Sequence, residues 1–158
     1  MPGCRLGYCG APKESIAAMN KIQSQSTTST SSITMAAAVE AISGPQYFIS
    51  EHNKKFLKRR DLVLNKLNDF DGIKCQKPEG AFYVYPNCEG IIGKKTPNGK
   101  HISNDEDFMT YLLEDQGVAG VHGAAFGLSP YFRLSYATSD AILEDACNRI
   151  KEACIKLT

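Results

Sequence analysis

The sequence lacks several features that would place it in a specialised class of protein. No apolar run approaches the roughly 20 residues that a membrane-spanning helix needs. No apolar stretch follows the first basic residue, so we expect no secretory signal peptide. The net charge is only +1, and no sustained basic stripe is present. Binding to nucleic acid or to an anionic membrane is therefore not expected.

The six cysteines lack a pattern that would give them a shared role. None of them forms a Cys-x-x-Cys pair, and none has a histidine partner at the spacing of a zinc site. A chain of 158 residues, 42% of them hydrophobic, is long enough to bury a core without disulfides. We therefore expect no metal site, and free thiols in a reducing cytoplasm, mostly as small core residues.

The first third of the chain is predicted to be mostly helical. Residues 5–9 have the composition of a short strand, and Pro12 can begin a helix that runs to about Gln23. The Ser/Thr-rich stretch 24–32 has the composition of a linker. The alanine-rich segment 33–42 is predicted to form a second helix, because a Gly-Pro pair follows it closely.

A long amphipathic helix is predicted next, and the Asp71-Gly72 pair ends it. Five apolar residues recur at spacings of seven, seven, four and three, which places them on one side of a helix. We expect this stripe to face the core. Its members are Ile49, Phe56, Val63, Leu67 and Phe70.

From residue 73 onward the pattern changes to short strands, a loop and two helices. Strands are predicted over 73–76, 81–85, 118–121 and 131–136, with a loop over 90–103. The two helices are predicted to begin after the N-caps Asn104 and Ser139. Their expected inward residues are Phe108, Leu112 and Leu113 in the first, and Leu143, Cys147, Ile150 and Cys154 in the second.

Arg133 is the most informative residue, because it lies in the middle of an apolar strand. An unpaired buried arginine is costly, so its side chain reaches solvent, pairs with an internal Asp or Glu, or meets an anion. The planar guanidinium suits a carboxylate, which it can hold by two parallel hydrogen bonds. Glycines in 123–130 and 79–83 would let the backbone approach a ligand. Phe82 would then be either a core aromatic or a wall of the site.

Arg5 is a second candidate for anion binding. It follows a glycine near the start of the chain and could neutralise a phosphate, although a surface arginine would fit the same pattern. The histidines give no catalytic pattern, since no Ser–His–Asp or Cys–His pairing can be argued from their spacing. We expect structural or surface roles for His52, His101 and His122.

Three separated segments, in this order, are similar to the class I aminotransferases, and to bacterial aspartate aminotransferases in particular. They are Gly3-x-Arg5-x-Gly7-Tyr8-x-Gly10-x-Pro12, Glu79-Gly80-Ala81-Phe82-Tyr83 and Phe126-Gly127-x-x-x-x-Phe132-Arg133-x-Ser135-Tyr136-Ala137. The resemblance implies an α/β fold: the C-terminal part of a pyridoxal-phosphate-dependent transferase. Residues 1–45 would be a remnant of the large cofactor-binding domain. Residues 46–158 would be the long linking helix and a small mixed α+β domain.

The resemblance also implies an activity and a role for three residues. Enzymes of the family move an amino group from an amino acid to a 2-oxo acid, and they work as homodimers. The resemblance to aspartate aminotransferases makes aspartate the expected amino acid. Its cofactor, pyridoxal phosphate, acts as an electron sink. Arg5 would hold the cofactor phosphate, Arg133 the α-carboxylate of the substrate, and Phe82 would line the substrate pocket.

One departure from the family concerns the lysine that forms the Schiff base with the cofactor. In the family it lies roughly eight residues before the arginine that Arg5 matches, a position that falls before Met1. Neither Lys13 nor Lys21 stands at the family position. We therefore assign no catalytic residue and expect the chain to be inactive alone. The alternatives are a truncated fragment without catalysis, a half-protein that assembles with a separate N-terminal half, and an unrelated α/β binding module.

Overall fold

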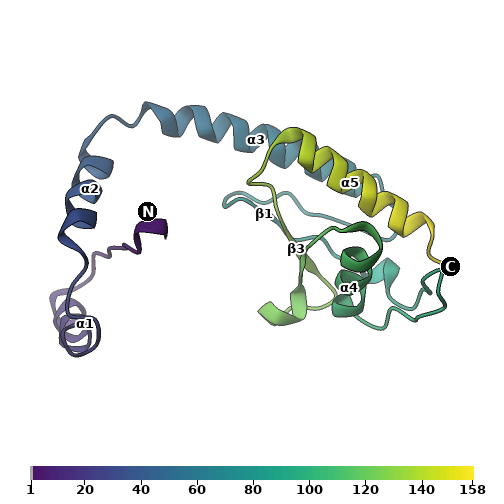
Figure 1. The fold of residues 1–158 in the computed structure, drawn as a ribbon, viewed down its shortest axis with the longest axis horizontal. Coiled ribbons are helices and arrows are strands. Elements are labelled where there is room, and N and C mark those ends of the chain that lie inside the picture. Colours follow the sequence, from purple (N-terminus) through teal and green to yellow (C-terminus); the bar gives the residue numbers. More distant parts are fainter. Residues whose placement is uncertain (1) are drawn as a thin grey trace. The chain divides into compact units, whose positions relative to one another are not determined.

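The computed structural model of the chain describes residues 2–158. The chain divides into two compact units, Met1–Ser50 and Glu51–Thr158. The first unit contains helices, and the second combines helices with a small sheet (Figure 1). The boundary between the units falls inside helix α3 (Tyr47–Asn68).

The first unit consists of a short 3-10 helix, η1 (Pro2–Cys4), and the helices α1 (Lys13–Ser26) and α2 (Ser32–Ser43), followed by the first residues of α3. Both helices predicted in this region are confirmed. The linker is shorter than predicted, because α1 continues through the first three residues of the Ser/Thr-rich stretch. The hydroxyls of Ser24 and Ser26 donate to the carbonyls of Lys21 and Ile22 in the preceding turn, so both serines lie within the helix.

The strand predicted over residues 5–9 is wrong. Arg5 has a φ of 55°, in the left-handed region, and residues 6–9 form no regular structure. A strand needs a hydrogen-bonded neighbour, and the described residues of the first unit provide no other strand. The composition alone could not reveal that missing partner.

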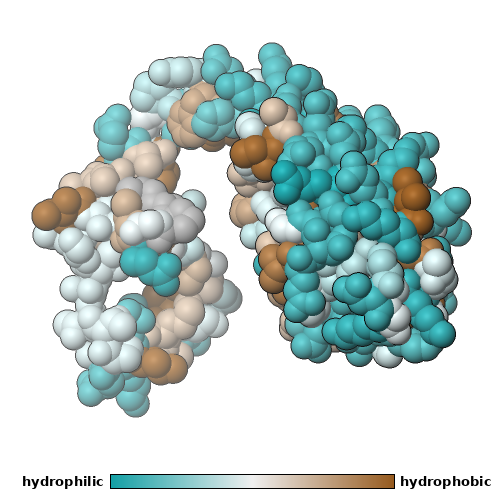
Figure 2. Space-filling view, turned by 45° about the vertical axis from the view of Figure 1, so that its right-hand side comes forward, coloured by the Kyte–Doolittle hydropathy of each residue, from teal (hydrophilic) through white to brown (hydrophobic). Residues whose placement is uncertain are grey.

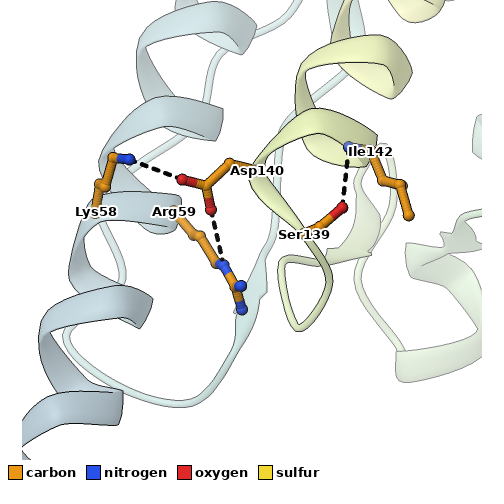
Figure 3. Close-up of polar contacts among 5 residues, drawn as sticks. All are labelled: Lys58, Arg59, Ser139, Asp140 and Ile142. Carbon is orange, nitrogen blue, oxygen red and sulfur yellow. Dashed lines mark hydrogen bonds and ion pairs between the residues drawn. The ribbon is translucent and has the colours of Figure 1, made fainter.

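Helix α3 packs along helix α5 (Asp140–Ile155) in a parallel arrangement (Figure 1). Polar contacts join the two helices or the residue just past the end of α3, and in three of them the partners are 82 residues apart. The pairs are Lys58–Asp140, Lys66–Asn148 and Asp69–Lys151. Figure 3 shows the first of these contacts, where Lys58 and Arg59 both reach Asp140 beside the Ser139 cap of α5.

The apolar stripe predicted for α3 is buried only in the second half of the helix. Val63 and Leu67 are buried and Phe56 is partly buried, as expected. Ile49 is 43% exposed, contrary to the prediction. Helical spacing places residues on one side of a helix, but burial also needs a neighbouring element along its whole length.

The sheet has three short antiparallel strands: β1 (Tyr83–Val84), β2 (Val121–His122) and β3 (Phe132–Ser135). β3 lies in the centre, with the order β1-β3-β2. The strands are shorter than predicted, and β2 shares only Val121 with the strand predicted over 118–121. Residues 73–76 form only one isolated bridge, Lys74 with Asn87. The prediction of a strand at 131–136 is confirmed, and it carries Arg133.

Helix α4 (Asp105–Gln116) and helix α5 supply much of the core of the second unit. Both N-caps are as predicted, since Asn104 accepts from the Asp107 N–H and Ser139 from the Ile142 N–H. The predicted inward residues of both helices are buried, with one exception. Leu113 is 55% exposed, because it lies about 100° around the helix from Leu112 and about 140° from Phe108.

Candidate functional site

The two faces of the sheet differ in composition and exposure. Val84 and Phe132 are fully buried on the inner face, against the core. Alternate residues point to the opposite face, which therefore carries Tyr83, Tyr131 and Arg133, all half-buried. The outer face is thus an aromatic surface with one cation in it.

Arg133 is held on this outer face by two aromatic rings. The carbon at the centre of its guanidinium lies 4.3 Å from the centroid of the Tyr83 ring and 4.4 Å from that of Phe126. Both distances are within the range of about 6 Å over which a ring face attracts a cation. The rings therefore offset part of the desolvation of the charge without occupying its N–H donors.

No carboxylate lies within 4.0 Å of the Arg133 guanidinium in the part of the chain that the structure describes. The other arginines of the second unit, Arg59, Arg60 and Arg149, each have an acidic partner. The alternative of an internal Asp or Glu partner for Arg133 is therefore not realised. Its donors are available to an anion from outside these residues.

The loop that carries Phe126 is compact. It contains the 3-10 helix η3 (Gly123–Phe126). The hydroxyl of Tyr85 donates to the Gly123 carbonyl at 3.2 Å. A Cβ atom on Gly123 would lie only 2.1 Å from the Leu128 carbonyl oxygen. The loop therefore requires glycine at this point, which fits the glycine-based approach expected from the sequence.

Asp105, the first residue of α4, fastens this loop to the core. Its side chain is 1% exposed, and it accepts hydrogen bonds from the Ala124 N–H at 2.8 Å and from the Ser129 hydroxyl. Burial by itself raises the pKa of this carboxyl, but the hydrogen bonds from Ser129 and Ala124 outweigh it and hold the pKa below its ordinary value. Asp105 is therefore an ionised, satisfied anchor at neutral pH.

Tyr85 lies within reach of both charges. Burial raises the pKa of its hydroxyl, the negative charge of Asp105 raises it further, and the positive charge of Arg133 lowers it. Its ring stacks on Tyr131 with centroids 5.5 Å apart and meets Phe126 edge-on at 6.4 Å. Asp105, Tyr85, Phe126 and Arg133 thus form one connected group of side chains.

Phe82 stands at the start of β1, beside Tyr83. It is 42% exposed, and its ring centroid lies 4.4 Å from that of Tyr83 and 6.5 Å from that of Phe56. The preceding residue, Ala81, has a φ of 62°, and its carbonyl accepts from the Tyr136 hydroxyl at 3.0 Å. Phe82 is therefore not a buried core aromatic.

A hollow of about 530 Å³ adjoins the aromatic surface. Its walls include Tyr83, Tyr85 and Tyr131, and lysine side chains rim it. The hollow is large enough for a small organic molecule. The lysines on its rim are Lys74 and Lys77.

The structure brings two of the three predicted site residues together. Arg133 and Phe82 lie in the second unit, and both contact the Tyr83 ring. Arg5 lies in the first unit, exposed, at the turn that follows η1.

Sequence reasoning missed three residues that shape the site: Tyr83, Phe126 and Asp105. Tyr83 stands two residues before Tyr85, and this alternation marks one face of a strand. Phe126 precedes a glycine in a loop, and this was the available signal for an exposed aromatic. Asp105 is one of three consecutive acidic residues that follow the predicted cap Asn104, and nothing local distinguishes it from its acidic neighbours.

A comparison with known families identifies the family of this chain. Residues 1–150 match the family described as "Aminotransferase class I and II". The match covers nearly the whole chain, and the chain therefore belongs to this family. The resemblance drawn from the three motifs is confirmed.

The relatives of this chain include bacterial aspartate aminotransferases. The chain is 55% identical to the "Aspartate aminotransferase" of Rhizobium meliloti (strain 1021) over its full length, which is 38% of that relative. It is 53% identical to the "Aspartate/prephenate aminotransferase" of Cereibacter sphaeroides, again over the full chain and 40% of the relative. The chain thus spans about two-fifths of the length of these relatives.

Solved structures of the same family share the fold. The aspartate aminotransferase from Rhizobium meliloti has a TM-score of 0.95 and 55% identity, with 100% of this chain and 40% of that one covered. The aspartate aminotransferase from Thermus thermophilus with maleate has a TM-score of 0.84 and 36% identity, with 97% and 38% covered. The predicted fold class, a partial α/β transferase fold with a helical segment and a small sheet, is confirmed.

Two other features of the described residues concern sites of different kinds. In the part of the chain that the structure describes, no helix is both long and apolar enough to cross a membrane. Over residues 2–158, no cluster of three or more His, Cys, Asp or Glu side chains has the arrangement of a metal site.

Proposed function

We propose that this chain forms the substrate-carboxylate part of an aminotransferase that moves an amino group from an amino acid, with aspartate as the first candidate, to a 2-oxo acid. The observation that carries the proposal is Arg133. Its guanidinium is half-buried, contacts two aromatic rings, and has no carboxylate within 4.0 Å in the described chain. Both substrates of such a reaction carry a carboxylate next to the reacting carbon, so one arginine can orient each in turn.

The neighbouring residues would shape the pocket around that carboxylate. The rings of Tyr83 and Phe126 restrict the guanidinium to a narrow range of positions. Phe82 presents an exposed apolar face beside them and would exclude water from one side of the substrate. An oriented carboxylate and an apolar surface that excludes water would contribute to the rate by fixing the position of the bond that reacts.

Membership of this family implies pyridoxal phosphate as the cofactor, and we propose Arg5 as its phosphate partner. The donor chemistry fits, because an arginine offers a fork of N–H groups that matches a phosphate. Arg5 is exposed, on a turn where the backbone is left-handed. When bound, the cofactor supplies an electron sink for the carbon that loses its proton. Arg5 would hold it, and Arg133 would orient the substrate.

We propose the division of the chain that the resemblance implied. Residues 1–45 belong to the large domain, and residues 46–158 comprise the linking helix and the small domain. The lysine of the family has no counterpart in residues 1–158 at the matching place. We therefore also propose that this polypeptide, by itself, does not turn over aspartate and 2-oxoglutarate. Its buried free thiols suit a reducing compartment, and we propose the cytoplasm.

A second candidate role, assembly with further protein, is favoured by the surface of the first unit. In Figure 2 the helices of this unit show pale and brown surface, whereas the second unit is mostly hydrophilic in the same view. Exposed apolar residues of this extent mark surfaces that pack against protein. A homodimer or a separate N-terminal half would satisfy them. Within the described residues of the first unit, the most exposed aliphatic residues are Ile22, Ile33, Val39 and Ile42.

A chimera tests the proposed activity. These 158 residues would replace the matching part of the Rhizobium meliloti relative, and the purified chimera would be assayed with aspartate and 2-oxoglutarate. We expect turnover, and we expect Arg133→Gln to lower kcat/KM for both substrates by about 10- to 100-fold, the loss expected for a charge-assisted hydrogen-bonded pair. Arg149→Gln is the matched control, since this arginine pairs with Asp145 on the surface. A folded chimera in which both variants behave alike would contradict the proposal.

A further inference from the structure

Asp105 lies outside the residues to which the proposed function gives a role, yet it connects directly to them. Its carboxylate is buried and accepts from two donors, the Ala124 N–H and the Ser129 hydroxyl. These donors stand on either side of Phe126 in the chain. One side chain of the core thus holds both ends of the segment that presents Phe126.

The segment between the two donors has little freedom to move independently. Gly123 is packed so closely that a Cβ would meet the Leu128 carbonyl oxygen at 2.1 Å and the Tyr131 carbonyl oxygen at 2.7 Å. The Tyr85 hydroxyl holds the Gly123 carbonyl from the sheet side. Phe126 projects from this fastened loop over the Arg133 guanidinium, with 4.4 Å between the guanidinium carbon and the ring centroid.

We propose that Asp105 is a positioning residue for Arg133, acting through the 123–129 loop and the Phe126 ring. It does not touch the substrate. A carboxylate suits the task because each of its two oxygens accepts one donor, Oδ2 from Ala124 and Oδ1 from Ser129. The effect on carboxylate binding rests on the proposed function, whereas the effect on the position of Phe126 does not.

The substitution Asp105→Asn separates charge from shape. Asparagine has almost the same volume, but it offers one carbonyl oxygen, and its NH₂ group would face a donor. The Ser129 hydroxyl can turn to accept from this NH₂ group, but the bonds to a charged carboxylate are then replaced by weaker, neutral hydrogen bonds. We expect the loop to loosen and the Phe126 ring to leave the guanidinium in part of the population. Carboxylate affinity would then fall by about threefold to tenfold, the value of one cation–π contact.

The experiment uses NMR of the 158-residue chain and follows the Arg133 Nε–H signal. Two nearby ring faces shift this signal by their ring currents, so its position reports whether Phe126 is in place. Ser129→Ala removes one donor and leaves the carboxylate, which keeps the test informative if Asp105→Asn does not fold. Asp107→Asn is the matched control, because Asp107 lies in the same helical turn and accepts from the Ser103 N–H, away from the loop.

We expect Asp105→Asn and Ser129→Ala to move the Arg133 signal toward that of Phe126→Leu, and Asp107→Asn to leave it unchanged. In the Phe126→Leu background, Asp105→Asn should weaken maleate binding no further, since the two residues act through one contact. An unchanged Arg133 signal in both loop variants would overturn the inference while leaving the proposed function intact. Failure of the unmodified chain to bind maleate would instead count against the proposed function, and the signal would still decide the inference.

Discussion

At the scale of single residues, aromatic rings on the outer face of the sheet lower the cost of placing an arginine in an apolar strand. Most arginines of this unit are balanced by a carboxylate, as Arg59 is by Asp140. Arg133 is balanced by ring faces instead. Ring faces lower the cost of desolvation but leave the N–H donors available. This difference between the arginines is the reason for assigning a binding role to one of them.

Gly123→Ala provides a direct test of the loop that supports this arrangement. The added methyl would lie 2.1 Å from the Leu128 carbonyl oxygen, so the backbone must shift. We expect a loss of about 1–3 kcal/mol of unfolding free energy, the usual range for overpacking, measured by urea denaturation. Gly80→Ala is the control, since a Cβ there has nothing within 4 Å. Equal stability of the two variants would show that the loop is less tightly packed than described.

The thiols form a second test at the residue scale. Desolvation raises the pKa of Cys88 to about 12 and that of Cys75 to about 11, so hardly any thiolate is present at pH 8. Cys4 and Cys9 are exposed. A chromogenic disulfide reagent at pH 8 should therefore modify two thiols quickly and the others only after unfolding. Rapid modification of more than two in the folded chain would contradict the packing of the core.

At the scale of elements, α3 and α5 run parallel and both contribute buried residues to the core of the second unit. The polar rim of these two helices consists mainly of exposed ion pairs, which contribute little. Burial in the shared core contributes more, because Leu67 of α3 and Ile150 of α5 are fully buried. Apolar packing in the core, rather than the salt bridges in Figure 3, therefore contributes most to the stability of these two helices.

Two leucines of α3 test whether apolar burial stabilises this helix more than its exposed contacts do. Leu67 is fully buried and Leu57 is 49% exposed. We expect Leu67→Ala to lower the free energy of unfolding by about 2–5 kcal/mol, and Leu57→Ala to change it by less than about 1 kcal/mol. Both values come from urea denaturation followed by circular dichroism. Similar losses in the two variants would mean that the second half of α3 is not the buried part.

Helices were easier to predict from the sequence than strands, for a physical reason. The caps Asn104 and Ser139 act within three residues of themselves, so their signal is local. Strands depend on partners far along the chain. Residues 73–76 have suitable composition but form only one bridge, and residues 5–9 form none. Pairing of this kind is not encoded in a short window of sequence.

The residues of the site also differ in how far they could be predicted from the sequence. A charge in an apolar strand made Arg133 recognisable from the sequence alone. The ring of Phe126 could not be placed over it, because its position depends on a hydrogen bond between Asp105 and a residue 24 positions later. The role of Asp105 itself was hidden, since three acidic residues stand together at the start of α4 and only one of them is buried.

At the scale of the whole molecule, the lowered pKa of Asp105 makes the free energy of unfolding depend on pH. This pKa is below its ordinary value in the folded chain, so the unfolded chain binds the proton more readily. The stabilisation is complete above the unfolded pKa, near 3.8, and is lost as the pH falls through the folded value. We expect the stability difference between the unmodified chain and Asp105→Asn to be largest at pH 7 and to shrink at pH 3. Urea denaturation at both pH values measures it, and a constant difference would rule out this linkage.

The central claim is that Arg133 is the anchor for a substrate carboxylate, and a maleate titration tests it most directly. Maleate is a suitable probe, because a related Thermus thermophilus enzyme has been solved with it. The titration would follow the arginine Nε–H signals of the 158-residue chain. We expect saturable shifts centred on Arg133, which disappear in Arg133→Gln and persist in Arg149→Gln. Saturable binding that survives Arg133→Gln, or shifts confined to other arginines, would contradict the claim.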